Sequence, residues 1–289
     1  MFECKLKDPV FFKKFFEALK PIFPDGTLQA KEDGIMISMI EPTRTMAIST
    51  FLPKEMFEKY NCDQATDISI YFDDFLKAFT RLGKKTTCKL TLDEVKNNLV
   101  VKLEGKLNKK FIISLRDQTL SESIDPSETP VADISFNIDG DLFIEALKDA
   151  KAISGVQGDV VLKTDDLGVF HISSFGTHGE MAIEMDYEPV EDAKKEVESA
   201  FAIDSLLNIM KMGTLCDEVL VEMRNNAPIG ISFIFNNFDA PNLGVIRVDY
   251  LLAPLASDDD YEDDDEDIEK IFDENDDSKQ IEGEVEATE

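Results

Sequence analysis

The chain has 289 residues, 43% of them hydrophobic, which is enough for two domains with buried cores. Its 60 acidic and 30 basic residues give a formal charge of -30, which argues against nucleic acid as a partner because phosphate contacts need lysine and arginine. The charge is unevenly distributed, however: residues 257–289 contain 18 acidic residues and 2 lysines, so -16 lies there and -14 on the preceding 256 residues.

The first half of the chain alternates short strands with two helices. A strand near 2–7 precedes a helix over Pro9 to Lys20, and a second helix begins at Phe72, where apolar residues recur at helical spacing. Turn sequences such as Asp25-Gly26 separate these segments. Alternation of apolar and polar residues predicts further strands near 27–31, 34–40, 45–51, 66–71, 87–92, 98–103 and 110–115.

The second half repeats this plan after about 130 residues. The segment FDDFLKAFTRLG, from Phe72, matches AIDSLLNIMKMG, from Ala202, in its acidic start, helical pattern and glycine. A third helix contains Leu142 and Ile153, and a fourth runs from Asp204 to Met212. Strands are predicted near 131–137, 158–164, 168–174, 180–186, 198–203, 217–223, 229–236 and 244–252. The repeat indicates an α+β protein made mostly of antiparallel strands.

Two segments lack a pattern that would build a core. Residues 117–130 are polar and contain two prolines, which is typical of a linker. Residues 257–289 cannot bury enough apolar area to offset their ordering entropy, so we expect a disordered acidic tail. This division predicts one domain over 1–116, a connecting linker over 117–130, a second domain over 131–256 and the tail.

The four helices are predicted to expose basic residues opposite their apolar stripes. The predicted stripes are Phe12, Phe15, Phe16 and Leu19; Phe72, Phe75, Leu76, Phe79 and Leu82; Leu142, Ala146, Leu147 and Ile153; and Leu206, Ile209 and Met210. Any amphipathic helix exposes charge, but here the sign is basic in a chain twice as rich in acid, with few acids such as Glu17 and Asp74 on those faces. The nine basic residues are Lys13, Lys14, Lys20, Lys77, Arg81, Lys84, Lys148, Lys151 and Lys211.

If the four helices share a surface, that surface is positive and suits the phosphates of double-stranded DNA. No motif for reading base edges accompanies it, so binding would be independent of DNA sequence.

Four segments occur in the order typical of one family. They are Met1-Phe2-Glu3, KKFFEALK at 13–20, the block from 33 to 63 that begins DGIMISMIEPTRT, and Leu252-Ala253-Pro254. Over residues 1 to about 256 the chain resembles the DNA sliding clamps, the proliferating cell nuclear antigen (PCNA) family and its archaeal counterparts. The resemblance implies two clamp domains, each of antiparallel sheets with two helices on the inner face.

The same resemblance implies an assembly and its partners. Three subunits would join head to tail into a ring around duplex DNA, pairing edge strands near 109–115 and 176–184. The ring would act as a processivity factor on chromosomal DNA, in the nucleus of a eukaryote or the nucleoid of an archaeon. DNA polymerase, clamp loader, nuclease and ligase would insert short peptide motifs into a pocket under the linker. The matching pocket positions are Ile40, Arg44, Met46, Leu120, Ile124, Pro126, Pro228, Leu251, Ala253 and Pro254.

Catalysis, metal binding and membrane insertion have little support in the sequence. His171 and His178 lack further ligands nearby, no phosphate-binding loop motif occurs, and the carboxylate runs lack the apolar context that tunes catalytic acids. We expect no enzyme activity, no metal and no cofactor. No apolar run reaches the roughly 18 to 20 residues of a membrane span. The start of the chain has no signal-peptide pattern. The four cysteines are far apart, which favours free thiols in an intracellular protein.

Two alternatives to a general replication clamp remain open. One is a specialised clamp, either a checkpoint subunit or one member of a heterotrimer, which would not form a ring by itself. The other is an acidic histone chaperone, since an acidic tail suits basic proteins. The tail itself either repels non-specific DNA or folds back on the pocket, because Asp265, Ile268, Ile271 and Phe272 have the spacing of the partner peptide.

Overall fold

The computed structural model describes most of the chain. The described residues are 1–80, 82–83, 85–117, 131–155, 158–177, 179–190, 195–216, 218–236 and 246–256. The chain from Met1 to Pro254 forms one compact unit. Most of the predicted linker and all of the predicted tail lie outside the described residues.

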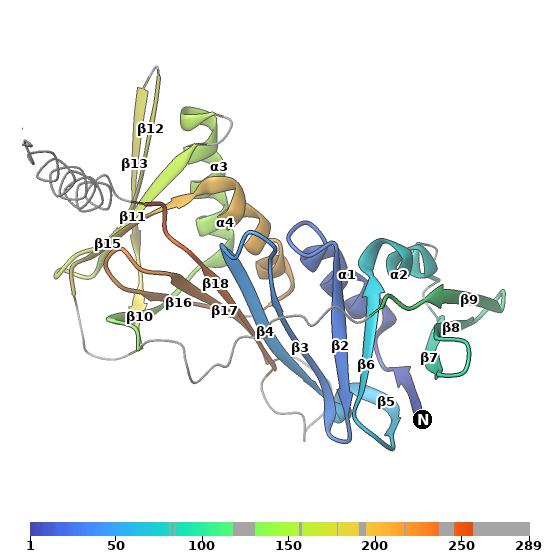
Figure 1. The fold of residues 1–289 in the computed structure, drawn as a ribbon. Helices are drawn as coiled ribbons and strands as arrows, with labels where there is room; N and C mark the ends of the chain where they lie inside the picture. The colour runs from blue at the N-terminus through green and yellow to red at the C-terminus, as the bar shows by residue number, and fades with distance from the viewer. Residues whose placement is uncertain are drawn as a thin grey trace, which may run out of the picture. The chain divides into compact units, whose positions relative to one another are not determined.

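Three antiparallel sheets carry the fold (Figure 1). Their strands are β1 (Phe2–Leu6), β2 (Asp25–Lys31), β3 (Gly34–Ile40), β4 (Met46–Pro53), β5 (Phe57–Cys62), β6 (Thr66–Tyr71), β7 (Thr87–Asp93), β8 (Asn98–Glu104), β9 (Lys109–Ser114), β10 (Ile134–Ile138), β11 (Asp159–Thr164), β12 (Val169–Gly176), β13 (Gly179–Asp186), β14 (Glu188–Pro189), β15 (Val197–Ala202), β16 (Glu218–Met223), β17 (Ile229–Phe235) and β18 (Ile246–Leu252). The sheet orders are β5-β1-β7-β8-β9, β14-β10-β16-β17-β18-β4-β3-β2-β6 and β13-β12-β11-β15.

The sequence did not predict β5 and β14. Strand β5 pairs with β1, placing Cys4 opposite Tyr60. Only its two ends, Phe57 and Cys62, are buried, so its polar middle has no alternating apolar signal. Strand β14 is two residues long and both are exposed. The other predicted strands are present, with ends that shift by a few residues.

The helices are α1 (Pro9–Leu19), α2 (Phe72–Phe79), α3 (Gly140–Ser154) and α4 (Ile203–Ile209), with the 3-10 helices η1 (Lys54–Met56) and η3 (Met212–Leu215). Asp8 and Asp139 cap α1 and α3, each accepting two backbone N–H bonds at 2.8 to 3.0 Å. These bonds satisfy donors that have no partner within the helix. Among the helices that are described, none has both the length and the apolarity needed to cross a membrane.

The two halves repeat their helix cores with a constant offset of 131 positions. The N-caps Asp8 and Asp139 are separated by this number, and so are the buried residues of the helices that follow. The matching buried pairs are Phe12 and Phe143, Phe15 and Ala146, Phe16 and Leu147, Leu19 and Ala150, Phe72 and Ile203, Phe75 and Leu206, and Ala78 and Ile209. The internal repeat is therefore a repeat of packing as well as of pattern.

The predicted buried stripe of α3 was partly wrong. Leu142 and Ile153 are exposed by 54% and 40%, while Phe143 is fully buried. The buried residues Phe143, Ala146, Leu147 and Ala150 follow helical spacing closely. At about 100° per residue these four residues span an arc of about 100°, and Leu142 and Ile153 both lie outside that arc, beyond Ala146.

One sheet connects the two halves. Strand β18 pairs with β17 on one side and with β4 on the other, so backbone hydrogen bonds run from the second half into the first. Helix α1 contacts α2 and α4, and α3 contacts α4. Figure 1 shows α1 to α4 along one side of the sheets. This arrangement places the exposed helix positions on a common side, as the nucleic-acid hypothesis requires.

Candidate nucleic-acid interface

The basic residues predicted to face DNA lie on or directly after the four helices. Seven of the nine are described, and each has an exposed or half-buried side chain: Lys13, Lys14, Lys20, Lys77, Lys148, Lys151 and Lys211. Arg81 and Lys84 lie outside the described residues. The structure therefore leaves these seven ammonium groups accessible to solvent.

Two of these lysines are paired with an acid on their own helix. Lys13 lies 3.5 Å from Glu17 on α1, and the ammonium group of Lys77 donates to Asp74 on α2 at 2.7 Å. The hydrogen bond from Lys77 to Asp74 and the charge of Asp74 raise the pKa of Lys77. Both pairs are solvent-exposed, and water screens such pairs, so they contribute little to stability.

Two further lysines are paired across helices. Lys20, at the end of α1, forms an ion pair with Asp73 in the first turn of α2. Lys151, in the last turn of α3, forms the equivalent pair with Asp204 in the first turn of α4. Each pair joins the two helices of one half.

The remaining lysines have no acidic partner within the described part of the chain. Lys211 donates to the amide oxygen of Asn208 at 2.8 Å. Lys14 and Lys148 have neither a hydrogen bond nor an ion pair with any described residue. These three are the described helix lysines most available to phosphate.

The helices expose more acids than the sequence led us to expect. The described helix segments are residues 9–20, 72–80, 140–155 and 203–211. They contain seven lysines and also seven exposed acids, which are Glu17, Asp73, Asp74, Asp141, Glu145, Asp149 and Asp204. The expectation of few acids was wrong, since helical positions next to the lysines, such as Asp73 and Asp149, are acidic and exposed as well.

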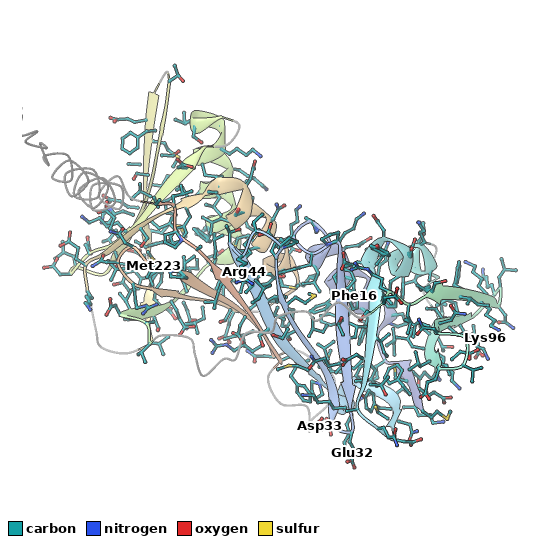
Figure 2. All side chains as sticks on the ribbon, in the orientation of Figure 1. Phe16, Glu32, Asp33, Arg44, Lys96 and Met223 are labelled. Carbon is teal, nitrogen blue, oxygen red and sulfur yellow. The ribbon has the colours of Figure 1, made fainter. Side chains whose placement is uncertain are left out.

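The predicted peptide pocket is only partly described, because Leu120, Ile124 and Pro126 lie outside the described residues. The backbone N–H of Ala253 donates to the carbonyl of Thr45 at 2.8 Å, which fixes the end of β18 beside the β3–β4 hairpin. Ile40, Ala47 and Leu251 follow one another across three paired strands. Figure 2 shows Arg44 in this part of the chain, where it has a left-handed φ of 59°.

A cavity of about 690 Å³ adjoins this hairpin, and Ala47, Pro228 and Leu251 contribute to its wall. Met46 is buried, at 8% exposure, and belongs to the core cluster. Pro228 is exposed, and Leu251 and Pro254 are half-buried. Of the described pocket residues, Met46 is therefore part of the core and the others are accessible to solvent.

A polar cluster forms another wall of the same cavity. Arg247 forms ion pairs with Glu222, at 3.1 Å, and with Asp249, which also accepts from the hydroxyl of Ser232 at 2.6 Å. Burial opposes the charge on Arg247, but the bonds and attraction from the two acids outweigh it and raise the pKa of Arg247. The cavity therefore combines an apolar and a charged side.

The two predicted seam strands are sheet edges. Strand β9 ends the five-stranded sheet and β13 ends the four-stranded sheet. Strand β9 begins with Lys109 and Lys110 and exposes 60% of Ile112, whereas β13 carries Glu180 and Glu184 as exposed acids. The two edges have complementary charge.

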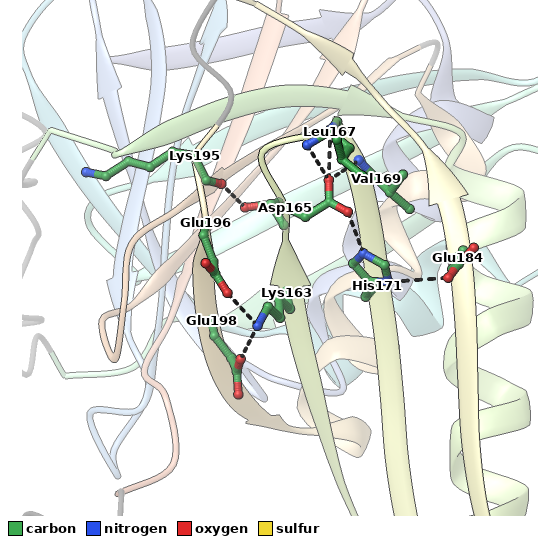
Figure 3. A network of polar contacts seen from close by, with 11 residues as sticks. Lys163, Asp165, Leu167, Val169, His171, Glu184, Lys195, Glu196 and Glu198 are labelled. Atoms are coloured by element: carbon green, nitrogen blue, oxygen red, sulfur yellow. Dashed lines mark hydrogen bonds and ion pairs between the residues drawn. The ribbon is translucent and has the colours of Figure 1, made fainter.

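The histidine singled out in the sequence belongs to a hydrogen-bonded turn (Figure 3). Nε2 of His171 lies 2.9 Å from the carboxylate of Asp165, which also accepts backbone N–H bonds from Leu167, Gly168 and Val169. The bond to His171 and then the backbone bonds lower the pKa of Asp165 to about 2. No group of three or more metal-ligating residues occurs among the described residues. His178 lies outside the described residues.

The fold and the surface together define the class of protein. Solved structures of proliferating cell nuclear antigen share the fold: the protein from Entamoeba histolytica matches with a TM-score of 0.77 and 18% identity, covering 88% of this chain and 99% of its own. The PCNA2–PCNA3 complex of Sulfolobus tokodaii matches with a TM-score of 0.74 and 22% identity, covering 88% and 100%. The architecture is that of a sliding clamp.

Sequence comparison supports the same conclusion. The family model for the N-terminal domain of proliferating cell nuclear antigen matches residues 1–122. The DNA polymerase sliding clamp of Thermofilum pendens is 27% identical over 252 residues, which cover 84% of this chain and 94% of that protein. These similarities support a PCNA-type DNA sliding clamp.

The sequence reasoning missed the acids that partner the helix lysines across helices. Asp73 and Asp204 were not singled out, although they occupy the same place in the two halves. Aligning the halves with the fixed offset would have found them, because the offset that relates Lys20 to Lys151 also relates these two acids.

Proposed function

We propose that the protein encircles duplex DNA as a processivity factor and tethers a DNA polymerase and other replication and repair proteins to it. The observation that carries the proposal is a clamp fold whose four amphipathic helices lie on one side of the sheets and expose lysines. Encirclement retains a partner on DNA by topology, so the proposal assigns no catalytic group, no metal and no cofactor. The site of action is chromosomal DNA.

The nine predicted basic residues supply the DNA-facing surface in this proposal. Lys14, Lys148 and Lys211 have no acidic partner among the described residues, so they are the strongest candidates for phosphate contacts. Contacts of lysine to phosphate carry no information about base sequence. The ring would therefore hold any duplex and slide along it.

Ring closure would use the edge strands β9 and β13 of neighbouring copies. The lysines of β9 and the acids of β13 attract one another, and pairing the edges removes unpaired backbone groups that promote aggregation. Domains 1–116 and 131–256 would then alternate around a ring of three copies. Because both complementary edges belong to one chain, we favour a homotrimer over a heterotrimer.

Partner peptides would bind beside the β3–β4 hairpin. The accessible residues Ile40, Pro228 and Leu251 provide apolar contact, and the cavity next to them has room for side chains. Each fully buried apolar anchor contributes roughly 1.5–3 kcal/mol. Polymerase, clamp loader, nuclease and ligase would compete for this site.

The first experiment measures assembly and topology together. The mass of the purified chain in solution should equal three copies. A preformed ring should thread over the free end of a linear duplex fixed to a bead, stay bound when that end is then blocked with streptavidin, and leave when the duplex is cut. A single-copy mass, or equal loss from blocked and cut DNA, contradicts the proposal.

The second experiment tests the helix surface. Lys20→Glu, Lys77→Glu and Lys211→Glu in one chain should weaken DNA binding and processivity without unfolding, because three negative charges replace three positive ones. Each lost phosphate contact that no acid compensates should also reduce the slope of log affinity against log salt by about 0.9. The control has the same charge change on exposed lysines outside α1 to α4, namely Lys31, Lys54 and Lys96. Equal effects of the two sets would refute a helix-lined channel.

A further inference from the structure

One interhelix ion pair is present in both halves of the chain. Lys20 pairs with Asp73 in the first half, and Lys151 pairs with Asp204 in the second. Both lysines and both aspartates are related by the same 131-position offset that relates the helix cores. The pair therefore occupies one structural position twice.

The other charged helix positions are not repeated in this way. The position equivalent to Lys14 is occupied by Glu145, and the position equivalent to Glu17 is occupied by Lys148. The sign of the charge is thus reversed between the halves at these exposed sites. The pair that joins the helices keeps both its lysine and its aspartate, which sets it apart from the variable positions around it.

The exposure of each ion pair lets its lysine exchange the aspartate for another anion. The side chains of Lys20 and Asp73 are 43% and 64% exposed, and those of Lys151 and Asp204 are 43% and 52% exposed. Each aspartate lies in the first turn of its helix, where the helix dipole favours a negative charge even without a lysine. A lysine can therefore leave its aspartate for another anion while the aspartate stays charged.

We propose that Asp73 and Asp204 are positioning residues that compete with DNA phosphate for Lys20 and Lys151. This inference rests on the proposed function. With no phosphate nearby, each aspartate holds its lysine at the junction between two helices and cancels its charge. When a phosphate approaches, the lysine exchanges partners, and the remaining carboxylate repels the phosphate and limits the gain in affinity.

Competition of this kind lowers the affinity of the ring for DNA, although the lysines remain in place. A lysine that merely exchanges one anion for another adds little to the counterion release that drives binding to DNA. Two of the seven described helix lysines are restrained in this way in each copy. In the proposed ring, this restraint lowers the affinity for duplex DNA at a given salt concentration.

The test neutralises both acids in one full-length chain, as Asp73→Asn with Asp204→Asn. Binding to a labelled linear duplex is measured between about 50 and 200 mM salt. We expect affinity at the lowest salt to rise about fivefold for each pair that meets DNA. The salt dependence should steepen by about 0.9 for each additional uncompensated lysine.

Two controls separate this effect from net charge and from structure. Asp33→Asn with Asp166→Asn makes the same charge change on exposed turns outside the helices. Figure 2 shows Asp33 at the end of its hairpin, away from Phe16 on α1. This control should bind DNA within about twofold of the unchanged chain. Asp73→Glu with Asp204→Glu keeps the charge and should restore the original salt dependence.

The outcomes distinguish failure of this inference from failure of the proposed function. Competition by the aspartates is refuted if the double asparagine variant leaves DNA affinity and the salt slope unchanged, or raises the affinity no more than the turn control does. If the reversal of Lys20, Lys77 and Lys211 still weakens DNA binding in that case, the proposed DNA-facing surface stands. If neither set of changes alters DNA binding, both are refuted. A loss of thermal stability without a gain in affinity assigns the pairs a structural role alone and also refutes the inference.

Discussion

Tyr250 offers a direct test of how the core of this fold is stabilised. The residue lies in β18 and is 1% exposed, with its ring 5.8 Å from that of Phe233 in an edge-to-face contact. Its hydroxyl has no hydrogen-bond partner among the described residues. Burial raises the pKa of Tyr250, so the group stays protonated and neutral.

Replacing Tyr250 with phenylalanine keeps the ring and removes the unpaired hydroxyl. A buried hydroxyl without a partner costs about 1–3 kcal/mol. We therefore expect Tyr250→Phe to raise the free energy of unfolding by about 1–2 kcal/mol. For a chain of this size each kcal/mol raises the melting temperature by about 2–4 °C. Urea unfolding and calorimetry at a fixed protein concentration measure both quantities, because assembly makes stability depend on concentration.

Tyr60 provides the matched control. Its hydroxyl lies 2.7 Å from the backbone carbonyl oxygens of both Lys31 and Gly34. Tyr60→Phe should lower the free energy of unfolding by about 1 kcal/mol, because it removes the hydrogen bonding of this hydroxyl to the backbone. The reasoning is refuted if Tyr250→Phe is destabilising by more than about 0.5 kcal/mol, or if the two variants shift stability in the same direction.

Three further local features are tested by substitution, the last with a matched control. Asp139→Ala removes the cap of α3 and should cost about 1 kcal/mol in urea unfolding, whereas no change would contradict the capping role. Folding lowers the pKa of Asp165, so its ionised carboxylate stabilises the fold. This stabilisation is complete above pH 3.8, the ordinary pKa of the group, and is lost as the pH falls through about 2. Acid titration of Asp165→Asn should lack this part of the pH dependence, and parallel acid curves would count against it. Gly176→Ala places a Cβ against the carbonyl oxygen of Ile153 and should cost about 1–3 kcal/mol, while Gly179→Ala, with open space around it, should melt like the unchanged chain.

Much of the fold could be predicted because its signals are local. Strands such as β3 and β4 alternate or run apolar over seven or eight residues. Helices α1 and α3 are indicated by a capping aspartate followed by apolar residues at helical spacing. Strand β5 has no such signal, because its place in the sheet depends on pairing with β1, a segment more than 50 residues earlier in the chain. Tertiary pairing decides cases in which local propensity is weak.

The site was less predictable than the fold. Helical periodicity located the described lysines on accessible positions, since exposure on one helix depends on residues three and four apart. The partner of Lys151 is 53 residues away on another helix, and no local pattern joins the two. The pocket residues outside the described part of the chain stay a prediction that follows from the family resemblance.

The formal charge of -30 first argued against DNA, and the helix lysines then argued for a positive channel. The structure supports neither extreme. The described helix segments contain seven lysines and seven exposed acids, so the described part of this surface is close to electrically balanced. A strongly positive surface would release many counterions and bind DNA more tightly at low salt. A balanced surface with a few uncompensated lysines attracts phosphate weakly at any position along the duplex. The proposed encirclement retains DNA by topology, so it does not depend on a strongly positive surface.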